Sequence, residues 1–267
     1  MAPPLTLAGV FAHPDDETWS LAAVFALVVP KGVRGVVWTA TRGQAGQIAD
    51  GSGATRETLP RVREAEERAA MAVVGVESVE FGGFVDGQVA DAGQDTLTTA
   101  VHRFLEREQP DVVVTMEPAG VTAHPDHIAV SAATQAAFAA YAAAPREREP
   151  RLYYWGAPVS DMASWRELGR ASGYELPGED DPYGGRGTPD EHFTCIVDGS
   201  AVAETAWRAL CEHRTQAGDA HYQLVGHQEG WRAVFARSAF IRVHPAPRPD
   251  DPREASLVEA FAGGGDG

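Results

Sequence analysis

Two short segments of the chain combine histidine and carboxylate side chains at spacings that suit metal chemistry. The first is His13-Pro14-Asp15-Asp16, within the run AHPDDE, and the second is His124-Pro125-Asp126-His127. Two histidines and one carboxylate with open coordination positions are the composition of a catalytic zinc site, and they equally fit a non-haem Fe(II) site. The two segments therefore indicate a metal-dependent enzyme, with the metal left open.

The spacing within each segment suggests how the ligands would be shared. His13 and Asp16 are three residues apart, so at the start of a helix both can reach one point. His127 would complete a three-ligand set from the other segment. Asp15, His124 and Asp126 would then remain for proton transfer and charge stabilisation, with a carboxylate taking the proton as a metal-activated water attacks.

A single His-Pro-Asp often marks only a capped helix start, because proline suits the first helical position and a carboxylate suits the first turn. The chain offers a comparison in His244-Pro245, which no aspartate follows and which lies in a Pro-rich stretch. We interpret that dipeptide as structural. Two complete motifs, each following a predicted buried strand, are better explained as one site.

The elements that must position the motifs alternate between strand and helix patterns through the first half of the chain. Apolar runs bounded by turn residues predict buried strands, and longer periodic segments predict helices. The expected strands are 5–12, 33–39, 79–81 and 111–116, and the expected helices are 16–29, 59–73, 95–108 and 125–143.

This alternation predicts an α/β fold, a Rossmann-like, doubly wound and mostly parallel sheet with helices on both faces. In such a sheet the strands 5–12 and 111–116 are neighbours at the switch point. Ligands bind in the crevice outside their carboxyl ends. Both motifs follow these strands, so the fold would bring them together across that crevice.

The second half is less regular and predicts a smaller C-terminal α+β portion. Strands are expected at 151–155 and 192–198, and helices at 158–171 and 200–216. Between them, 173–191 is an acidic, Gly/Pro-rich loop that is a candidate lid or a surface excursion. We expect one domain over 1–243, with a Rossmann-like half at 1–145, a substrate-shaping half at 146–243, and a Pro/Gly-rich tail at 244–267.

Composition narrows the function classes. The 267-residue chain has a formal net charge of −16, which disfavours nucleic acid and anionic membrane surfaces as partners. Lys31 is the only lysine and follows Pro30, so there is no Gly-Lys phosphate-binding loop. Cys195 and Cys211 are expected to be free thiols. No signal peptide or membrane-length apolar stretch is visible, so a cytoplasmic enzyme is the expectation, with a homo-oligomer left open.

AHPDDE followed by HPDH resembles the LmbE-like, PIG-L-type family of metal-dependent N-acetylglucosaminyl deacetylases, which includes mycothiol and bacillithiol biosynthesis enzymes. Weaker matches occur in the family's order over roughly residues 5–216. They are Thr41–Gly46, Arg63 with Glu66, Val74–Val76, Val85–Gly87, Val112–Thr115 before Pro118, and His213–Gln216.

The resemblance implies roles residue by residue. His13, Asp16 and His127 would hold Zn²⁺, with Fe²⁺ also possible, and Asp15 would be the general base. His124 would stabilise the tetrahedral oxyanion, with Asp126 orienting it and raising its pKa. The implied reaction is removal of an acetyl group from a small N-acetylated glucosaminyl substrate by a metal-bound water.

Two further residues, Arg63 and Asp86, match positions that contact sugar hydroxyls. For Arg63 the alternative is a salt bridge on a charged helix surface. His213 and Gln216 are expected to tie helix and sheet together. Gln44 stands where the family usually has glutamate, which puts substrate preference in doubt. Two alternatives stay open: an amidase acting on a thiol conjugate or antibiotic intermediate, and a metal- or sugar-binding protein without turnover.

Overall fold

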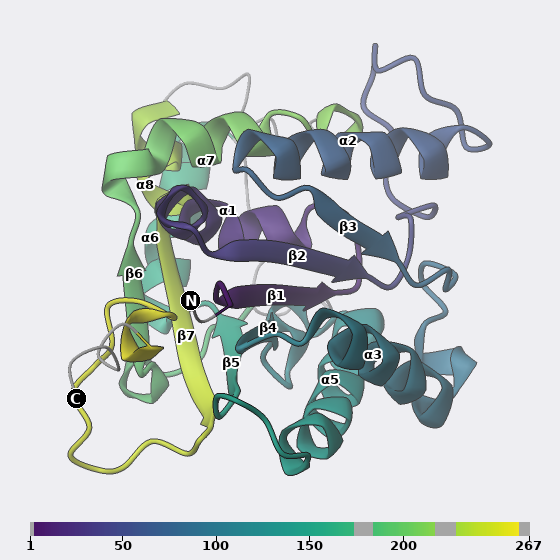
Figure 1. Ribbon diagram of the computed structural model, residues 1–267. Coiled ribbons are helices and arrows are strands. Elements are labelled where there is room, and N and C mark those ends of the chain that lie inside the picture. Colours follow the sequence, from purple (N-terminus) through teal and green to yellow (C-terminus); the bar gives the residue numbers. More distant parts are fainter. Residues whose placement is uncertain (1–2, 174–183, 217–227, 262–267) are drawn as a thin grey trace.

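A computed structural model describes residues 3–173, 184–216 and 228–261 of the chain, and its centre is a seven-stranded sheet (Figure 1). The strand order is β3-β2-β1-β4-β5-β7-β6, and the first five strands in this order are parallel to one another. The strands are β1 (Thr6–Phe11), β2 (Arg34–Thr39), β3 (Ser78–Phe81), β4 (Val112–Met116), β5 (Arg151–Gly156), β6 (Cys195–Asp198) and β7 (Arg237–His244).

Helices cover both faces of this sheet, as the doubly wound prediction requires (Figure 1). One apolar core packs α1, α2 and α7 against the sheet, and a second packs α3 and α5 against the other face. The described helices are α1 (Asp16–Val28), α2 (Leu59–Val73), α3 (Gln94–Glu108), α4 (Gly120–Ala123), α5 (Pro125–Ala143), α6 (Val159–Ala171), α7 (Ala203–Leu210) and α8 (Gln228–Phe235).

The two strands that precede the motifs are neighbours. Leu7, Ala8 and Gly9 of β1 pair in parallel with Val112, Val113 and Val114 of β4. Both strands are fully buried, which explains their continuous apolar sequences. Their carboxyl ends therefore meet at one edge of the sheet, where the chain enters α1 on one face and α5 on the other.

The C-terminal part holds two elements that the sequence pattern did not reveal, helix α8 and strand β7. β7 is antiparallel to both β5 and β6 and lies between them. The predicted helix over 200–216 is shorter than expected, because α7 ends at Leu210 and only a 3₁₀ turn, Arg214–Gln216, follows. The predicted strand at 192–198 is the shorter β6. Most of the loop 173–191 lies outside the described residues.

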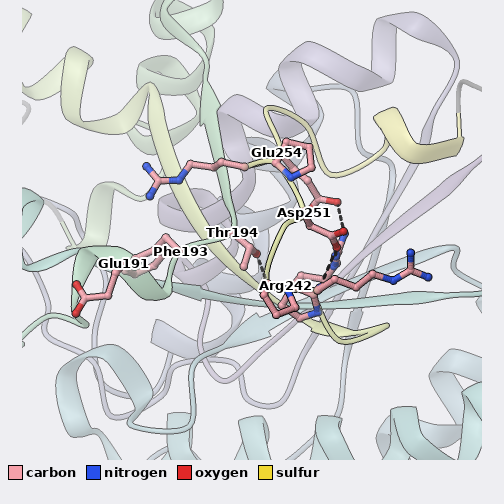
Figure 2. Close-up of a pocket in the computed structure, with 11 residues that line it drawn as sticks. Glu191, Phe193, Thr194, Arg242, Asp251 and Glu254 are labelled. Atoms are coloured by element: carbon pink, nitrogen blue, oxygen red, sulfur yellow. Dashed lines mark hydrogen bonds and ion pairs between the residues drawn. The ribbon is translucent and has the colours of Figure 1, made fainter.

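The described residues that follow β7 pack back onto β6 and β7. Figure 2 shows Arg242 of β7 pointing toward Asp251 and Glu254 in a pocket of about 460 Å³. The backbone of Glu254 also bonds with that of Thr194 and Ile196. Leu257 is buried in the first apolar core. Residues beyond the expected boundary at 243 therefore contribute to packing, while the terminal glycines lie outside the described residues.

No helix in the described part of the chain has the length and apolar character needed to cross a membrane. Both cysteines are free thiols, as predicted, with Cys195 buried in the first core. The carboxyl ends of β1 and β4 thus belong to a sheet that helices cover on both faces. The described residues contain no disulfide.

Candidate active site

The turn between β1 and α1 places Asp15 in a strained backbone conformation. Its φ is 102° and its ψ is −27°, a region that residues other than glycine rarely adopt. The carboxylate of Glu17 accepts the Asp15 N–H at 3.0 Å, and the Asp15 carbonyl accepts from the N–H groups of Thr18 and Trp19. These hydrogen bonds maintain the strained backbone conformation of Asp15. Backbone strain of this kind is characteristic of functional sites.

Three side chains from the two motifs converge on one point. His13 Nδ1 lies 3.1 Å from His127 Nε2 and 3.8 Å from Asp16 Oδ2, while His127 Nε2 lies 3.5 Å from Asp16 Oδ1. Ligands held tetrahedrally at 2.0–2.1 Å from zinc would lie about 3.3 Å apart. The separations of these three residues therefore suit one small metal ion.

Two of these three side chains are fixed from behind by the backbone. Asp16 Oδ2 accepts from the N–H groups of Ala12 and His13, at 3.2 and 2.9 Å, which leaves Oδ1 facing His127. His127 Nδ1 lies 3.0 Å from the carbonyl oxygen of Gly120 and donates to it. This bond turns Nε2 toward the other two side chains, as a metal ligand requires.

Two carboxylates fix the third of these side chains, His13. His13 Nε2 lies 3.1 Å from Asp86 Oδ1 and 3.2 Å from Asp126 Oδ2, so Nδ1 faces the convergence point. Burial lowers the pKa of His13, but hydrogen bonds to Asp126 and Asp86 and the nearby charge of Asp16 outweigh it and raise the pKa to about 10. Metal-binding histidines commonly have such a carboxylate behind them.

The same carboxylates could be considered as a second cation site around His13 Nε2. Asp126, however, also accepts from the N–H groups of Gly87 at 2.7 Å and Val89 at 3.1 Å. Asp86 accepts from Ala45 N–H at 2.8 Å. Because their oxygens are already engaged, Asp86 and Asp126 serve to orient His13.

Asp15 lies beside the three ligands and contacts Arg63. The Arg63 Nη2 donates to Asp15 Oδ2 at 3.2 Å and to the Pro14 carbonyl at 2.5 Å, and its Nη1 donates to the Gly43 carbonyl at 3.0 Å. Burial raises the pKa of Asp15 to about 6, although the Arg63 charge opposes this. A carboxylate with such a pKa is suited to accept a proton near neutral pH.

His124 differs from the expectation in its electrostatics. Its Nδ1 accepts the backbone N–H of Asp126 at 3.2 Å, so a neutral ring carries its proton on Nε2. Burial, together with the nearby His13 and His127, lowers its pKa. The Asp126 carboxylate contacts His13, and its charge opposes this lowering of the His124 pKa without reversing it. The lowered pKa of His124 contrasts with the raised pKa that was expected.

Comparison with known proteins decides the family. Residues 9–138 match the PIG-L family, described as GlcNAc-PI de-N-acetylase. The chain is 30% identical over 236 residues to the 1D-myo-inositol 2-acetamido-2-deoxy-alpha-D-glucopyranoside deacetylase of Rhodococcus jostii, covering 78% of this chain and 80% of that protein.

The chain belongs to the PIG-L family. Solved structures show the PIG-L fold across different activities. The 4-carboxy-2-hydroxymuconate hydratase GalB of Pseudomonas putida matches with a TM-score of 0.60 at 17% identity, over 92% of this chain and 99% of that one. The N,N'-diacetylchitobiose deacetylase of Pyrococcus horikoshii matches with a TM-score of 0.58 at 18% identity, over 92% and 88%. These likenesses establish the fold, and the chemistry has to be argued from the site.

The structure brings every predicted PIG-L site residue into one cluster, including the two expected to contact sugar. Arg63 is only 3% exposed, and Asp86 is 9% exposed, so neither is the surface group of a charged helix. Both bind protein groups at the site, Arg63 through Asp15 and Asp86 through His13. Their contact with a sugar stays a prediction.

Sequence reasoning gave no role to several groups of this PIG-L site. The Glu17 carboxylate that holds the Asp15 backbone was visible at the end of AHPDDE, but its role was not. The Gly120 carbonyl and the N–H groups of Gly87 and Val89 carry no side-chain signal at all. His213 was expected to be structural, and it is fully buried against Thr18 and Glu17, at 2.9 and 3.4 Å.

Proposed function

We propose that this chain is a metal-dependent hydrolase that removes the acetyl group from an N-acetylglucosaminyl-type substrate. The observation that carries the proposal is the position of Asp15, held by Arg63 directly beside three convergent ligand atoms. A site that only bound metal would need no such base. The family and the names of its relatives support the same activity.

His13, Asp16 and His127 would hold the metal ion, for which we propose zinc. Imidazole nitrogens and a carboxylate oxygen suit zinc, and they suit ferrous iron as well, so metal analysis distinguishes the two. Zinc bound there would lower the pKa of a water molecule toward 7 and thereby supply the nucleophile.

Asp15 would accept the proton of the attacking water and deliver it to the leaving amine nitrogen. Its raised pKa suits both steps, because the group must lose and regain a proton near neutral pH. The constrained Asp15 backbone and the Arg63 contact keep the carboxylate from rotating away. Positioning of this kind lowers the barrier without any further chemistry.

His124 would donate a hydrogen bond from Nε2 to the oxygen that becomes negatively charged. A neutral imidazole can do this, and its lowered pKa keeps it neutral at pH 7. The bond from the Asp126 N–H to His124 Nδ1 fixes the tautomer that carries the proton on Nε2. His124 is therefore prepared as a donor before substrate binds.

For the amine part of the substrate we propose a small N-acetylated sugar or its conjugate. Gln44, in the loop after β2, donates through its amide to the Phe84 carbonyl, and the Ala45 N–H binds Asp86. This polar edge beside His13 offers groups that can exchange hydrogen bonds with sugar hydroxyls. Glutamine in place of the family's usual glutamate makes that edge less negative.

An acetate-release assay on N-acetylglucosamine conjugates, with metal content measured on the same preparation, tests this proposal. We expect acetate release that depends on one equivalent of zinc or iron. Stoichiometric metal with no carboxylate released from any amide would instead identify a binding protein without turnover. Release from other amides only would identify the amidase alternative.

A further inference from the structure

An apolar cavity of about 260 Å³ opens beside Asp16 and His127, two of the three proposed metal ligands. Asp15, Asp16 and His127 line it, and the Asp16 and His127 side chains lie within 3.5 Å of each other. The rest of its wall is dominated by three tryptophans and two methionines, which are Trp19, Trp155, Trp165, Met116 and Met162. An apolar cavity whose polar groups are gathered at one end is typical of a site that binds one end of a ligand and reacts with the other.

The walls come from elements far apart in sequence. Met116 and Trp155 are paired residues at the carboxyl ends of β4 and β5. Trp19 of α1 and Trp165 of α6 are half-buried, with ring centroids 6.3 Å apart. Because tryptophan rings are large and rigid, they maintain such a cavity at little cost in conformational entropy.

Gly185 lines part of this wall, and the packing around it is tight. A Cβ at residue 185 would lie 3.0 Å from Met162 Cε and 3.2 Å from the Val121 carbonyl oxygen. Val121 itself has a φ of 61°, which is strained for a β-branched residue. The backbone of Gly185 and that of Val121 thus both lie close to the cavity. Strained backbone of this kind is common at ligand-binding sites.

The remaining polar groups of the site lie outside the cavity. Asp86, Asp126 and His124 do not line the cavity, and Asp86 instead faces His13 and the Ala45 amide. A sugar placed against tryptophan and methionine would lose hydrogen bonds from its hydroxyls, which is costly. An alkyl or aryl group would lose none. The sugar therefore suits the Asp86 side and an apolar group suits the cavity.

We infer that the cavity receives the acyl group of the scissile amide and that this enzyme prefers an apolar acyl group larger than acetyl. The inference rests on the proposed amide hydrolysis and specifies its substrate class. An acetyl group would place a single methyl in the cavity. A cavity of about 150 Å³ already holds a benzene molecule, so 260 Å³ leaves most of the space unfilled by acetyl.

The reaction is balanced with water alone. The C–N bond of the amide breaks and a C–O bond forms to the water oxygen. One water proton passes through Asp15 to the nitrogen, which gives an amine and a carboxylic acid. The proton of the acid then passes to the amine, so the products are a carboxylate and an ammonium group. Nothing in this step depends on the length of the acyl chain. Chain length changes only how much apolar surface leaves water, which amounts to about fourfold in kcat/KM for each methylene buried.

The test is a series of glucosamine amides that differ only in the acyl group, from acetyl through butyryl and hexanoyl to benzoyl. We expect kcat/KM to rise by about tenfold or more from acetyl to butyryl and to stay high for hexanoyl. A fall with chain length, with acetyl cleaved fastest, overturns the inference and leaves the proposed deacetylation intact. If kcat/KM rises only when an alkyl group is placed on the anomeric oxygen of the sugar, the cavity binds the aglycone and the inference is overturned.

Substitution within one helix supplies a matched pair. Met162→Trp fills the cavity, and we expect it to invert the preference so that the hexanoyl-to-acetyl ratio of kcat/KM falls below one. Val159→Trp adds the same ring to α6 at a residue that is 48% exposed and does not line the cavity. That variant should keep the wild-type ratio. Equal ratios in all three proteins would show that the cavity does not select the acyl group.

Binding of carboxylate products gives a readout without turnover. Calorimetry with acetate, butyrate and hexanoate, on zinc-loaded and metal-free protein, should show affinity rising with length and an increasingly negative heat-capacity change. Hexanoate binding no tighter than acetate overturns the inference. If no amide is hydrolysed but hexanoate still binds more tightly than acetate in both forms, the proposed function fails while the apolar cavity is retained as a binding site.

Discussion

The guanidinium of Arg63 donates to the carboxylate of Asp15 at 3.2 Å, joining helix α2 to the turn that follows β1. The same guanidinium also binds the carbonyl groups of Pro14 and Gly43. It is almost fully buried, so its geometry is fixed by these three acceptors. We therefore propose that Arg63 positions Asp15, the proposed general base, and kinetics can separate this role from sugar binding.

Arg63→Lys should lower kcat by about 10- to 100-fold and change KM little, because an ammonium group cannot reach all three acceptors at once. Steady-state kinetics on the best amide of the acyl series, with thermal unfolding as a folding control, measures this. A large rise in KM with kcat unchanged would instead identify Arg63 as a sugar contact.

Gly43→Ala should reproduce the Arg63 defect without touching that residue. An added Cβ would lie 2.1 Å from Arg63 Nη1, so the guanidinium would be displaced from Asp15. Gly51→Ala, in the same loop, is the matched control, because Gly51 also has a positive φ but no heavy atom lies within 4 Å of its Cβ position. Both variants bear backbone strain of about 1 kcal/mol. Comparable activity in the two would argue against the Arg63 contact.

Asp15→Asn should retain the metal and lose activity by about 10²- to 10⁴-fold, because the amide cannot accept the proton of the attacking water. Metal content by elemental analysis and rates by acetate release are measured on the same sample. Asp95→Asn, at an exposed position on α3, is the control and should behave as wild type. Wild-type rates in Asp15→Asn would remove Asp15 from its assigned role.

His127→Ala should abolish metal binding, because it removes one of the three convergent ligand atoms. Metal that binds only the folded state stabilises it by about 2.7 kcal/mol at a free concentration of 100 Kd. Chelation should therefore lower the unfolding temperature of the wild type and of the surface variant His102→Ala, but not that of His127→Ala. A zinc-dependent shift in His127→Ala would show that the ligand set is different.

Glu67→Gln should make the protein increasingly more stable than wild type as pH rises from about 5 to 8. Glu67 is fully buried, and burial together with the nearby Glu17 raises its pKa well above the ordinary value. Below pH 4.5 the carboxyl is neutral in both states. Above it the unfolded chain ionises first, so wild-type stability falls by up to about 1.4 kcal/mol per pH unit until the folded pKa is reached.

Denaturant unfolding at several pH values measures the Glu67 effect. Thr39 donates to Glu67 Oε1, and Oε2 has no hydrogen-bond partner among the described residues, so the amide can replace the neutral acid with little rearrangement. Glu57→Gln, at an exposed position, is the control and should leave the pH profile of stability unchanged. A constant difference between Glu67→Gln and wild type across this pH range would contradict the assignment.

The parallel part of the fold could be predicted from local patterns. β1, β2 and β4 are apolar runs buried on both faces, and α2 and α5 begin with proline near their first turn. β7 could not be predicted in this way. Its sequence RSAFIRVH gains its strand character from pairing with β5 and β6, and such pairing is a tertiary property.

The sequence by itself determined which residues meet at the site, because two motifs that follow adjacent parallel strands must converge at one edge of the sheet. It also carried enough of the family pattern to predict the ligands and the base. Only the tertiary structure decided what surrounds them. The Arg63 contact to Asp15, the lowered pKa of His124 and the tryptophan-lined cavity depend on groups that fold together from distant segments, and their distances and burial have no counterpart in sequence spacing.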